Sequence, residues 1–313
     1  MAAPLTDVSS ERTRVAVVGL GHMGEAIAER ILAAGYPLSV FNRSPGRDER
    51  LVAAGATRLG SAAAALAECD VCVTSLSDDG AVAEAIRGEH GVLAGARPGT
   101  ALVETSTISV QASSEIAADA ADAAAAGVAY LRAPFSGNPA AIRSGAATLV
   151  VSGPAATEAA LRPLLEAIVP TVRYAGEDEQ ARVLKLVLQV MIGGTAGLLA
   201  EALALGEAAG VERRALLETI RSSVAGSRFV EYKTEPLLAD DYSATFTTAM
   251  AVKDFDLVLA LADATGSDLP LTQELRALLE SACDHGHADK DFLSILLELK
   301  ARSAGVGTAT KGG

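Results

Sequence analysis

The sequence predicts two domains of different fold class, an α/β domain with a parallel sheet and an all-α domain, joined by a long interdomain helix. Strand-like and helix-like segments alternate over the first half of the 313 residues, which is typical of a parallel sheet with helices on both faces. A glycine-rich turn separates the first strand from the first helix, and the second half has helical periodicity almost throughout. We expect domains at 13–177 and 178–300, with loose ends at 1–12 and 301–313.

The elements of the first domain follow from the hydrophobic pattern. The apolar, β-branched segment 14–20 predicts the first strand, and 24–35 has the period of a helix that ends at Gly35. The same alternation continues along the chain. It predicts further strands at 36–42, 70–77, 101–107, 128–137 and 147–153, and further helices at 81–88 and 109–127.

The second domain begins with an unusually long helix. Segment 178–209 contains no breaker except small glycines. Long helices with large apolar faces also predict a homodimer built mainly from this domain. Shorter helices are predicted at 215–224, 253–264, 271–285 and 292–300.

Composition narrows the class of protein. Half the residues are apolar, which indicates packed cores, and the formal net charge of -13 argues against nucleic-acid and anionic-membrane partners. We identify no apolar run long enough and free enough of charge to span a bilayer. The N-terminal segment lacks the order of a signal peptide, so a cytoplasmic enzyme is expected. The odd count of three cysteines does not form a disulfide framework.

Three glycines between the first strand and the first helix have the G-x-G-x-x-G spacing of a dinucleotide-binding turn. In a Rossmann domain, Gly19 would allow the tight turn, Gly21 would let the backbone approach the pyrophosphate, and Gly24 would let the helix pack against the strand. The helix N-terminus would attract the phosphates. The expected binding segment also includes Leu20, His22 and Met23, and His22 is interpreted as contributing mainly its backbone.

The end of the second strand predicts which dinucleotide binds. NAD is usually held by an acidic residue about 20 residues after the turn, but here the chain has Asn42, Arg43 and Ser44. Arg43 can pair with a 2′-phosphate and stack on adenine, whereas a carboxylate would repel that phosphate. We therefore predict NADP as the cofactor, with NADPH preferred over NADH.

Catalytic groups are expected in the second half, where Lys185 and Gln189 lie four residues apart on the long predicted helix and share a face. On a surface helix, a lysine belongs to the polar stripe. On a helix buried between domains, a desolvated Lys185 would be a proton donor.

Four motifs together resemble the β-hydroxyacid dehydrogenase family, which includes 3-hydroxyisobutyrate dehydrogenase and the tartronate semialdehyde and glyoxylate/succinic semialdehyde reductases. They occur in that family's order and spacing, and the resemblance covers about 14–300. The motifs are GLGHMG, SGNPAAIRSG, LKLVLQ and AVKDFDL.

The resemblance implies a mechanism and a set of site residues. Lys185 would protonate the carbonyl oxygen as hydride arrives from the nicotinamide, and it would take the alcohol proton in the reverse reaction. The substrate would be a small hydroxy acid, an aldehyde or a related carbonyl compound. The other implied residues are Ser136, Gly137, Phe246 and Asp254 for the substrate, and Leu76, Ser77, Thr107 and Lys253 for the cofactor.

The chain departs from the family pattern at three positions. Asn138 stands where a second glycine is usual, Gln189 replaces an asparagine, and Ala133 replaces an aspartate. Asn138 would place a side chain near the substrate's acid group, where it could bind a neutral polar group or fill part of the pocket. We therefore predict weak activity on simple 3-hydroxy acids and better activity on a bulkier or less anionic carbonyl compound.

Two alternative functions remain open. An imine reductase shares this architecture and cofactor, although that family usually has aspartate or tyrosine in place of Lys185. A non-catalytic dehydrogenase-like protein is the second alternative. Cys69 and Cys72 are interpreted as structural, and the segment with His285 and His287 as a helix-breaking glycine turn, so no metal is expected.

Overall fold

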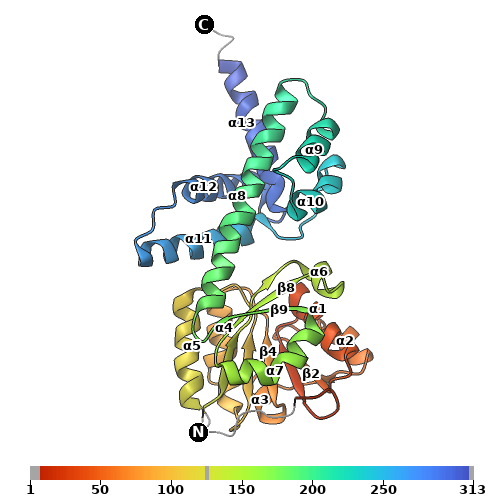
Figure 1. Ribbon diagram of the computed structural model, residues 1–313, viewed down its shortest axis with the longest axis vertical. Helices are drawn as coiled ribbons and strands as arrows, with labels where there is room; N and C mark the ends of the chain where they lie inside the picture. Colours follow the sequence, from red (N-terminus) through yellow and green to blue (C-terminus); the bar gives the residue numbers. More distant parts are fainter. Residues whose placement is uncertain (1–7, 124–126, 310–313) are drawn as a thin grey trace. The chain divides into compact units, whose positions relative to one another are not determined.

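The computed structural model describes residues 8–123 and 127–309. The chain divides into two compact units, Met1–Lys185 and Leu186–Gly313. Figure 1 labels the helices and strands and colours them in the order of the sequence. The division falls inside helix α8 (Gln180–Ala208) rather than before it. The first turn of α8 therefore belongs to the first unit.

A single mixed sheet forms the centre of the first unit. Its strand order is β3-β2-β1-β4-β5-β6-β8-β7, with β9 pairing with β8. Neighbouring strands run parallel except where β8 pairs with β6 and β7. The strands are β1 (Val15–Val18), β2 (Leu38–Phe41), β3 (Thr57–Arg58), β4 (Val71–Thr74), β5 (Ala101–Glu104), β6 (Ala129–Arg132), β7 (Phe135–Ser136), β8 (Thr148–Ser152) and β9 (Thr171–Gly176).

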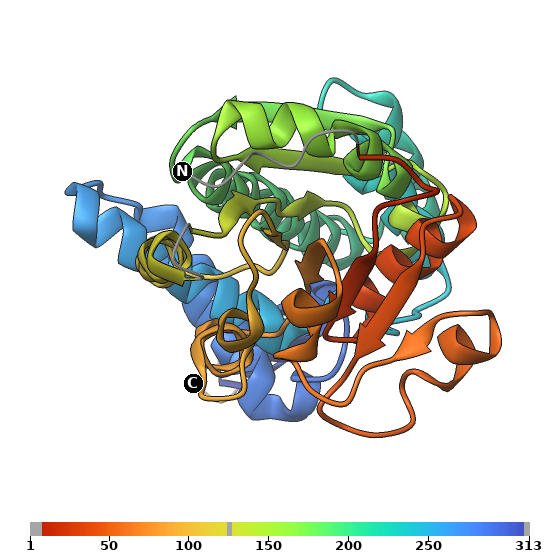
Figure 2. The same ribbon diagram turned by 90° about the horizontal axis from the view of Figure 1, so that it is seen from below.

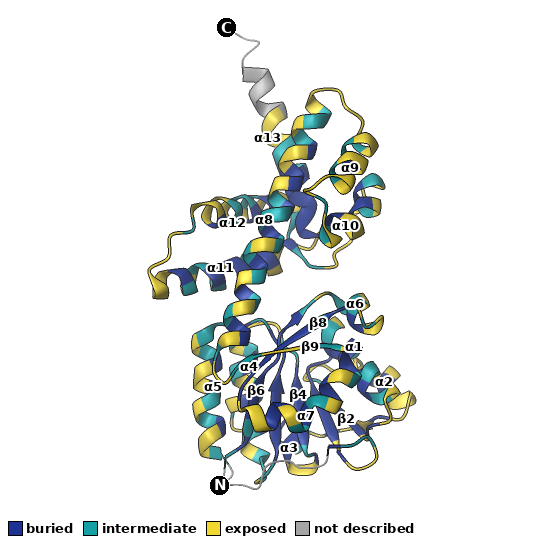
Figure 3. Cartoon of the chain, in the orientation of Figure 1, coloured by how far each residue is buried: buried dark blue, intermediate teal, exposed yellow. Residues whose placement is uncertain are grey.

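Helices cover both faces of this sheet (Figure 2). Because side chains alternate along a strand, Val15 and Val17 of β1 enter one core with α1 and α7, while Ala16 and Val18 enter a second core with α3, α4 and α5. The central strands β1, β4 and β5 are accordingly buried along their whole length, as Figure 3 shows. The helices are α1 (His22–Ala33), α2 (Glu49–Ala53), α3 (Ala64–Glu68), α4 (Asp79–Arg87), η1 (Val92–Gly95), α5 (Val110–Asp122), α6 (Pro139–Arg143) and α7 (Ala155–Ile168).

The regular elements of the second unit, in its described residues, are helices, with one isolated antiparallel β-bridge between Thr247 and Asp291. Its core contains Ala196, Leu199 and Leu203 from α8, together with Phe255 and Phe292. Thr247 caps the start of α11, and Gly266 ends it in the left-handed conformation. The elements after α8 are α9 (Arg213–Ser222), α10 (Arg228–Leu238), α11 (Thr248–Thr265), α12 (Pro270–Ala282), η3 (Cys283–His287), η4 (Phe292–Ser294) and α13 (Ile295–Ala309).

The fold confirms the predicted class: an α/β domain with a largely parallel sheet, followed by helices. It corrects several elements. The segment expected to be one strand at 128–137 is broken between β6 and β7, because Pro134 cannot donate a ladder hydrogen bond. The α2–β3 segment, α6, α7, β9 and α10 were not predicted.

Both segments expected to be loose ends contain described structure. Val8 is buried in the first core and residues 9–13 form a hydrogen-bonded turn. At the other end, α13 continues to Ala309, supported by a 2.8 Å bond from Arg302 Nε to Glu298 one turn earlier. The expectation of loose ends at 1–7 and 310–313, and of helix at 124–126, lies outside the described residues.

The prediction that no segment is long and apolar enough to cross a membrane is wrong for helix α8. Within the described part of the chain, this one helix is long and apolar enough to do so by length and composition. The sequence from 186 to 200 indeed contains no charged residue. Core helices of soluble proteins meet the same criterion, and Ala196, Leu199, Ala200 and Leu203 of α8 pack into the core of the second unit.

Candidate cofactor and substrate site

The glycine-rich turn lies at the carboxyl end of β1 and leads directly into α1. Gly19 has a φ of +92°, and a Cβ atom there would lie 2.3 Å from the Ser75 carbonyl oxygen. A Cβ atom at Gly24 would lie 1.9 Å from the Gly19 carbonyl oxygen. Both positions therefore require glycine for the fold itself. A Cβ atom at Gly21 would meet no protein atom within 4 Å.

The other residues of the turn divide into core and surface. Leu20 is buried, and Met23 is half-buried against the same core, so both side chains stabilise the domain. His22 is exposed and is the first residue of α1. Gly21 is the N-cap of α1 and has no side chain to occupy the free N–H groups.

Asn42 connects this turn to the end of β2. Its Oδ1 accepts a 2.8 Å hydrogen bond from the Leu20 N–H, and its Nδ2 donates to the Ser44 carbonyl at 2.8 Å. Asn42 therefore shapes the turn with both ends of its amide. Arg43 and Ser44 are exposed. The Arg43 guanidinium lies 2.7 Å from the Glu84 carboxylate on α4.

Two loops from neighbouring strands adjoin the turn. The Leu76 side chain lies within 2.8 Å of the position a Gly19 Cβ would take. The Leu76 N–H donates to Ser106 Oγ at 2.8 Å, which joins the loop after β4 to the loop after β5. Ser77 donates to Asp78, the N-cap of α4, at 2.6 Å, and Thr107 is half-buried. The predicted cofactor residues of the first unit thus converge on one edge of the sheet.

This edge fits a dinucleotide. The turn leaves space at Gly21, the free N–H groups of α1 begin there, and no carboxylate follows β2 in the sequence FNRS. The pyrophosphate would lie on the N-terminus of α1. Ligands of open α/β sheets bind at this carboxyl edge.

The predicted substrate loop has a defined geometry. Ser136 is the last residue of β7 and pairs with Thr148 of β8. Gly137 has a φ of +141°, and a Cβ atom there would lie 2.9 Å from the Ala147 methyl group. Asn138 is the N-cap of α6, and its Oδ1 accepts a 2.9 Å bond from the Ala141 N–H. The Asn138 oxygen therefore already serves the fold as a helix cap, while its Nδ2 group carries two further donors for a ligand.

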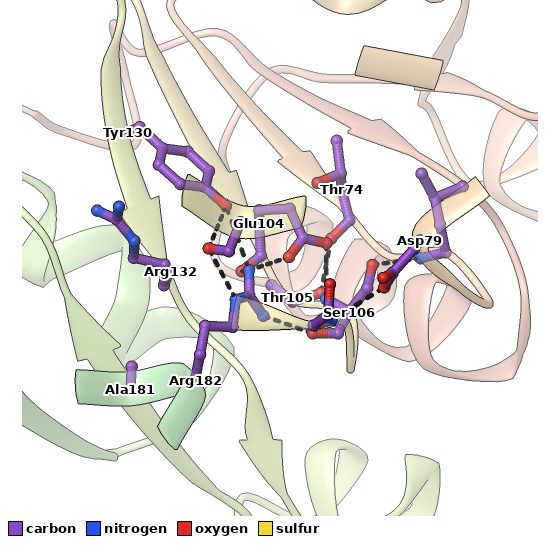
Figure 4. Close-up of polar contacts among 12 residues, drawn as sticks. Thr74, Asp79, Glu104, Thr105, Ser106, Tyr130, Arg132, Ala181 and Arg182 are labelled. Carbon is purple, nitrogen blue, oxygen red and sulfur yellow. Dashed lines mark hydrogen bonds and ion pairs between the residues drawn. The ribbon is translucent and has the colours of Figure 1, made fainter. Parts of the chain in front are cut away.

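Lys185 is half-buried on α8, at the end of the first unit. One turn earlier, Arg182 forms an ion pair with Glu104, the last residue of β5, and both side chains are almost completely buried. Figure 4 shows Arg182 pointing into a group of polar residues around the loop after β5. This ion pair explains why the start of α8 belongs to the first unit.

The remaining predicted residues lie in the second unit. The Gln189 amide donates to the Asp254 carboxylate, and both side chains are buried. Lys253 Nζ lies 2.9 Å from the other oxygen of Asp254. The structure thus brings these three predicted residues together. Phe246 is half-buried and makes an edge-to-face contact with Phe292, with ring centroids 5.5 Å apart.

The remaining candidate ligands have structural surroundings. Cys69 and Cys72 are buried free thiols, and burial raises the pKa of both, so neither is a reactive thiolate. His285 Nδ1 lies 2.8 Å from Glu298, and Gly286 has a φ of +82°, as expected for the glycine turn. In the described residues, no group of three or more His, Cys, Asp or Glu side chains could hold a metal ion.

Sequence reasoning missed the Arg182–Glu104 pair. Both residues interrupt apolar segments, in ALVE and ARVLKLV. Each is a charged residue in a segment predicted to be buried, and buried charges require partners. That signal would have identified both residues, although not their pairing across 78 positions.

The sheet, the glycine turn at its carboxyl edge and the helical second unit define a dinucleotide-binding enzyme of the two-unit dehydrogenase class. Family models agree. The NAD-binding domain of 6-phosphogluconate dehydrogenase matches residues 14–176. A second model, described as the NAD-binding region of NADP-dependent 3-hydroxyisobutyrate dehydrogenase, matches residues 180–299.

Comparison with individual proteins leads to the same class of enzyme. The chain is 35% identical to the NAD-dependent L-serine dehydrogenase of Pseudomonas aeruginosa over 89% of this chain and 95% of that protein. A structure of Mycobacterium tuberculosis 3-hydroxyisobutyrate dehydrogenase with L-serine has a TM-score of 0.82 at 29% identity, covering 92% and 99% of the two chains. An imine reductase from Bacillus cereus has a TM-score of 0.58 at 26% identity, with the same coverage. The chain belongs to the β-hydroxyacid dehydrogenase family and is an NAD(P)-dependent oxidoreductase.

Proposed function

We propose that the chain is an NADP-dependent dehydrogenase or reductase that interconverts a small hydroxy acid, or a related alcohol, with its carbonyl compound, and that Lys185 is its general acid and base. The observation that carries this proposal is the position of Lys185. Lys185 lies on α8, and the first turn of this helix is bonded through Arg182 to the carbonyl of Ser106 in the loop after β5. Ser106 directly precedes the predicted nicotinamide residue Thr107 in the chain.

Each part of the site has a defined task in this reaction. The cofactor, when bound, supplies or accepts the hydride. Lys185 would donate its ammonium proton to the carbonyl oxygen during reduction and accept the hydroxyl proton during oxidation. The loop at Ser136 and Gly137 would hold the substrate's polar group through a hydroxyl and backbone N–H groups. Thr107, Leu76 and Ser77 would position the nicotinamide half.

The proposed preference for NADP rests on the end of β2. Arg43 is exposed there and pairs with one exposed carboxylate, Glu84, so its guanidinium can turn to a 2′-phosphate at small cost. Asn42 holds the backbone of this loop in place. Relatives include an enzyme named NAD-dependent, which makes a direct comparison of the two cofactors necessary.

The substrate is proposed only as a class. The relatives named for L-serine and for 3-hydroxyisobutyrate place both compounds in the test panel, together with short aldehyde acids, ketones and cyclic imines. The test measures NADPH and NADH oxidation with the carbonyl compounds, and reduction of NADP and NAD with the hydroxy acids. Reduction of cyclic imines alone would favour the imine reductase alternative, and cofactor binding without turnover of any compound would favour the non-catalytic one.

We further propose that the protein is a homodimer assembled through α8. Val187, Met191, Leu198 and Leu205 are between half and three-quarters exposed. Their spacing of four, seven and seven residues places them on one side of the helix. A second copy of this chain is the proposed occupant, because the same stripe on a partner helix would be complementary to it. We propose no nucleic-acid or membrane partner.

A further inference from the structure

The buried pair of Arg182 and Glu104 is the most deeply enclosed charge cluster near the predicted site. The exposed fraction of the side chains is 1% and 0%. Burial opposes the charge on Arg182, but the nearby Glu104 carboxylate and Tyr130 outweigh this and raise its pKa. Arg182 is therefore a guanidinium, and a buried guanidinium must have its donors satisfied.

The guanidinium bonds to several parts of the domain at once. Its Nη1 donates to the Ser106 carbonyl at 2.5 Å, and its Nη2 donates to the Glu104 carboxylate and, at 3.2 Å, to the Glu104 carbonyl. Its Nε lies 3.3 Å from Ser113 Oγ on α5, and its Nη2 lies 3.4 Å from the Tyr130 hydroxyl on β6. The first turn of α8 is thus fixed to β5, α5 and β6 (Figure 4).

The cluster also extends to a predicted cofactor loop. The other oxygen of Glu104 accepts a 2.8 Å bond from the Ser106 N–H. Ser106 Oγ in turn accepts the 2.8 Å bond from the Leu76 N–H. A continuous path of hydrogen bonds therefore runs from Arg182 through Glu104 and Ser106 to Leu76.

A buried ion pair is a poor device for stability alone, because a well-packed apolar pair of similar volume is often at least as stabilising. Its directional bonds, in contrast, fix positions. Arg182 and Lys185 are three residues apart and lie on neighbouring positions of the helix surface. Fixing the Arg182 guanidinium therefore also fixes the backbone position from which the Lys185 side chain extends.

We propose that Arg182 is a positioning residue that holds Lys185 in register with the cofactor loops at Leu76 and Thr107. This inference rests on the proposed role of Lys185 in proton transfer. Arg182 itself does not touch substrate or cofactor in this account. Its role is to make the start of α8 and the loops after β4 and β5 one rigid body.

The test compares Arg182→Lys with the double variant Arg182→Met/Glu104→Leu. The double variant removes both charges and keeps similar volume, so it should fold even if either single loss does not. Its kcat should fall about 10- to 100-fold, the cost of a misplacement near 1 Å, while KM for the substrate stays near the parent value. Arg182→Lys keeps the cation but not the planar guanidinium fork, so its kcat should lie between those of the parent and the double variant.

A matched control is Arg213→Met in the second unit. Like Arg182, Arg213 donates to both carboxylate and backbone oxygens, here the carboxylates of Glu207 and Asp240 and the carbonyl of Leu237, but it has no predicted role in the site. This variant should keep the parent kcat even where its Tm falls. A double variant that folds with the parent kcat would overturn the positioning role, as would an equal loss of kcat in Arg213→Met.

A second readout does not depend on activity. Amide hydrogen exchange at Leu76, Ser106 and the first turn of α8 should be faster in the double variant, and unchanged in Arg213→Met. Unchanged exchange at all three places would overturn the inference. If Lys185→Ala keeps full turnover, the proposed function fails. If Lys185→Ala is inactive while the double variant has the parent kcat and exchange, only the role of Arg182 fails.

Discussion

Changing Arg43 or Glu84 should alter the cofactor preference in opposite directions. In the structure the two side chains form an ion pair at 2.7 Å, and both are mostly exposed, at 79% and 65%. Such exposed pairs contribute about 0–1 kcal/mol. Glu84→Gln removes this competitor for the guanidinium, so NADPH should bind up to about fivefold more tightly. Arg43→Ala should weaken NADPH binding by about 1.5–3 kcal/mol, the value of a hydrogen bond to a charged group.

The assay is titration of each variant with NADPH and with NADH, followed by nicotinamide fluorescence. Because NADH lacks the 2′-phosphate, its Kd should stay nearly constant across the parent, Arg43→Ala and Glu84→Gln. Arg221→Ala is a control, since that arginine is exposed on α9 of the second unit and is not among the predicted cofactor residues. Equal affinity of the parent for both cofactors would refute the reasoning, as would a parallel loss of NADH binding in Arg43→Ala.

Three further predictions follow from the geometry. Gly21→Ala should leave the Tm of the free protein nearly unchanged and weaken NADPH binding. Gly24→Ala should lower the Tm itself, because its Cβ atom would lie 1.9 Å from the Gly19 carbonyl oxygen, whereas a Cβ atom at Gly21 meets no protein atom within 4 Å. Equal Tm losses in the two variants would contradict this. Leu198→Glu should convert a dimer to a monomer in analytical ultracentrifugation, and a monomeric parent at micromolar concentration would refute the proposed assembly. Asn138→Gly with Gln189→Asn should raise the ratio of kcat/KM for a small aldehyde acid over an uncharged carbonyl compound, and the single variants should be measured as well, so that any coupling between the two substitutions is resolved. A parent that already strongly prefers the small acid, with no rise in the double variant, would show that the departures are neutral.

The parts of the fold that local patterns determine were predictable. The β1–turn–α1–β2 unit was correct because strand alternation, glycine spacing and helical period agree over one short stretch. The break between β6 and β7 was missed because Pro134 was included in an apolar segment, although proline excludes a central strand. The extension of α13 was missed because glycines and small residues at the end suggested a loose tail.

The bonding of the candidate site residues was not predictable from the sequence. Asn138 was interpreted through the substrate, yet Asn followed by Pro139 is also the signature of a helix N-cap and a first helical residue. Arg182 and Glu104 are 78 residues apart, and no local period relates them. Side-chain partners between distant segments depend on packing of the whole domain, which a pattern along the chain does not contain.

The most direct test of the central claim is the single-turnover rate of Lys185→Ala with saturating NADPH and the best carbonyl substrate. General acid catalysis contributes about 10²–10⁴-fold, so the rate should fall by that factor. NADPH affinity and Tm should match those of the parent. Lys300→Ala, which removes a lysine paired with Glu207 in the helical unit, should keep the parent rate. A rate for Lys185→Ala near that of the parent, with the fold and cofactor binding intact, would contradict the account.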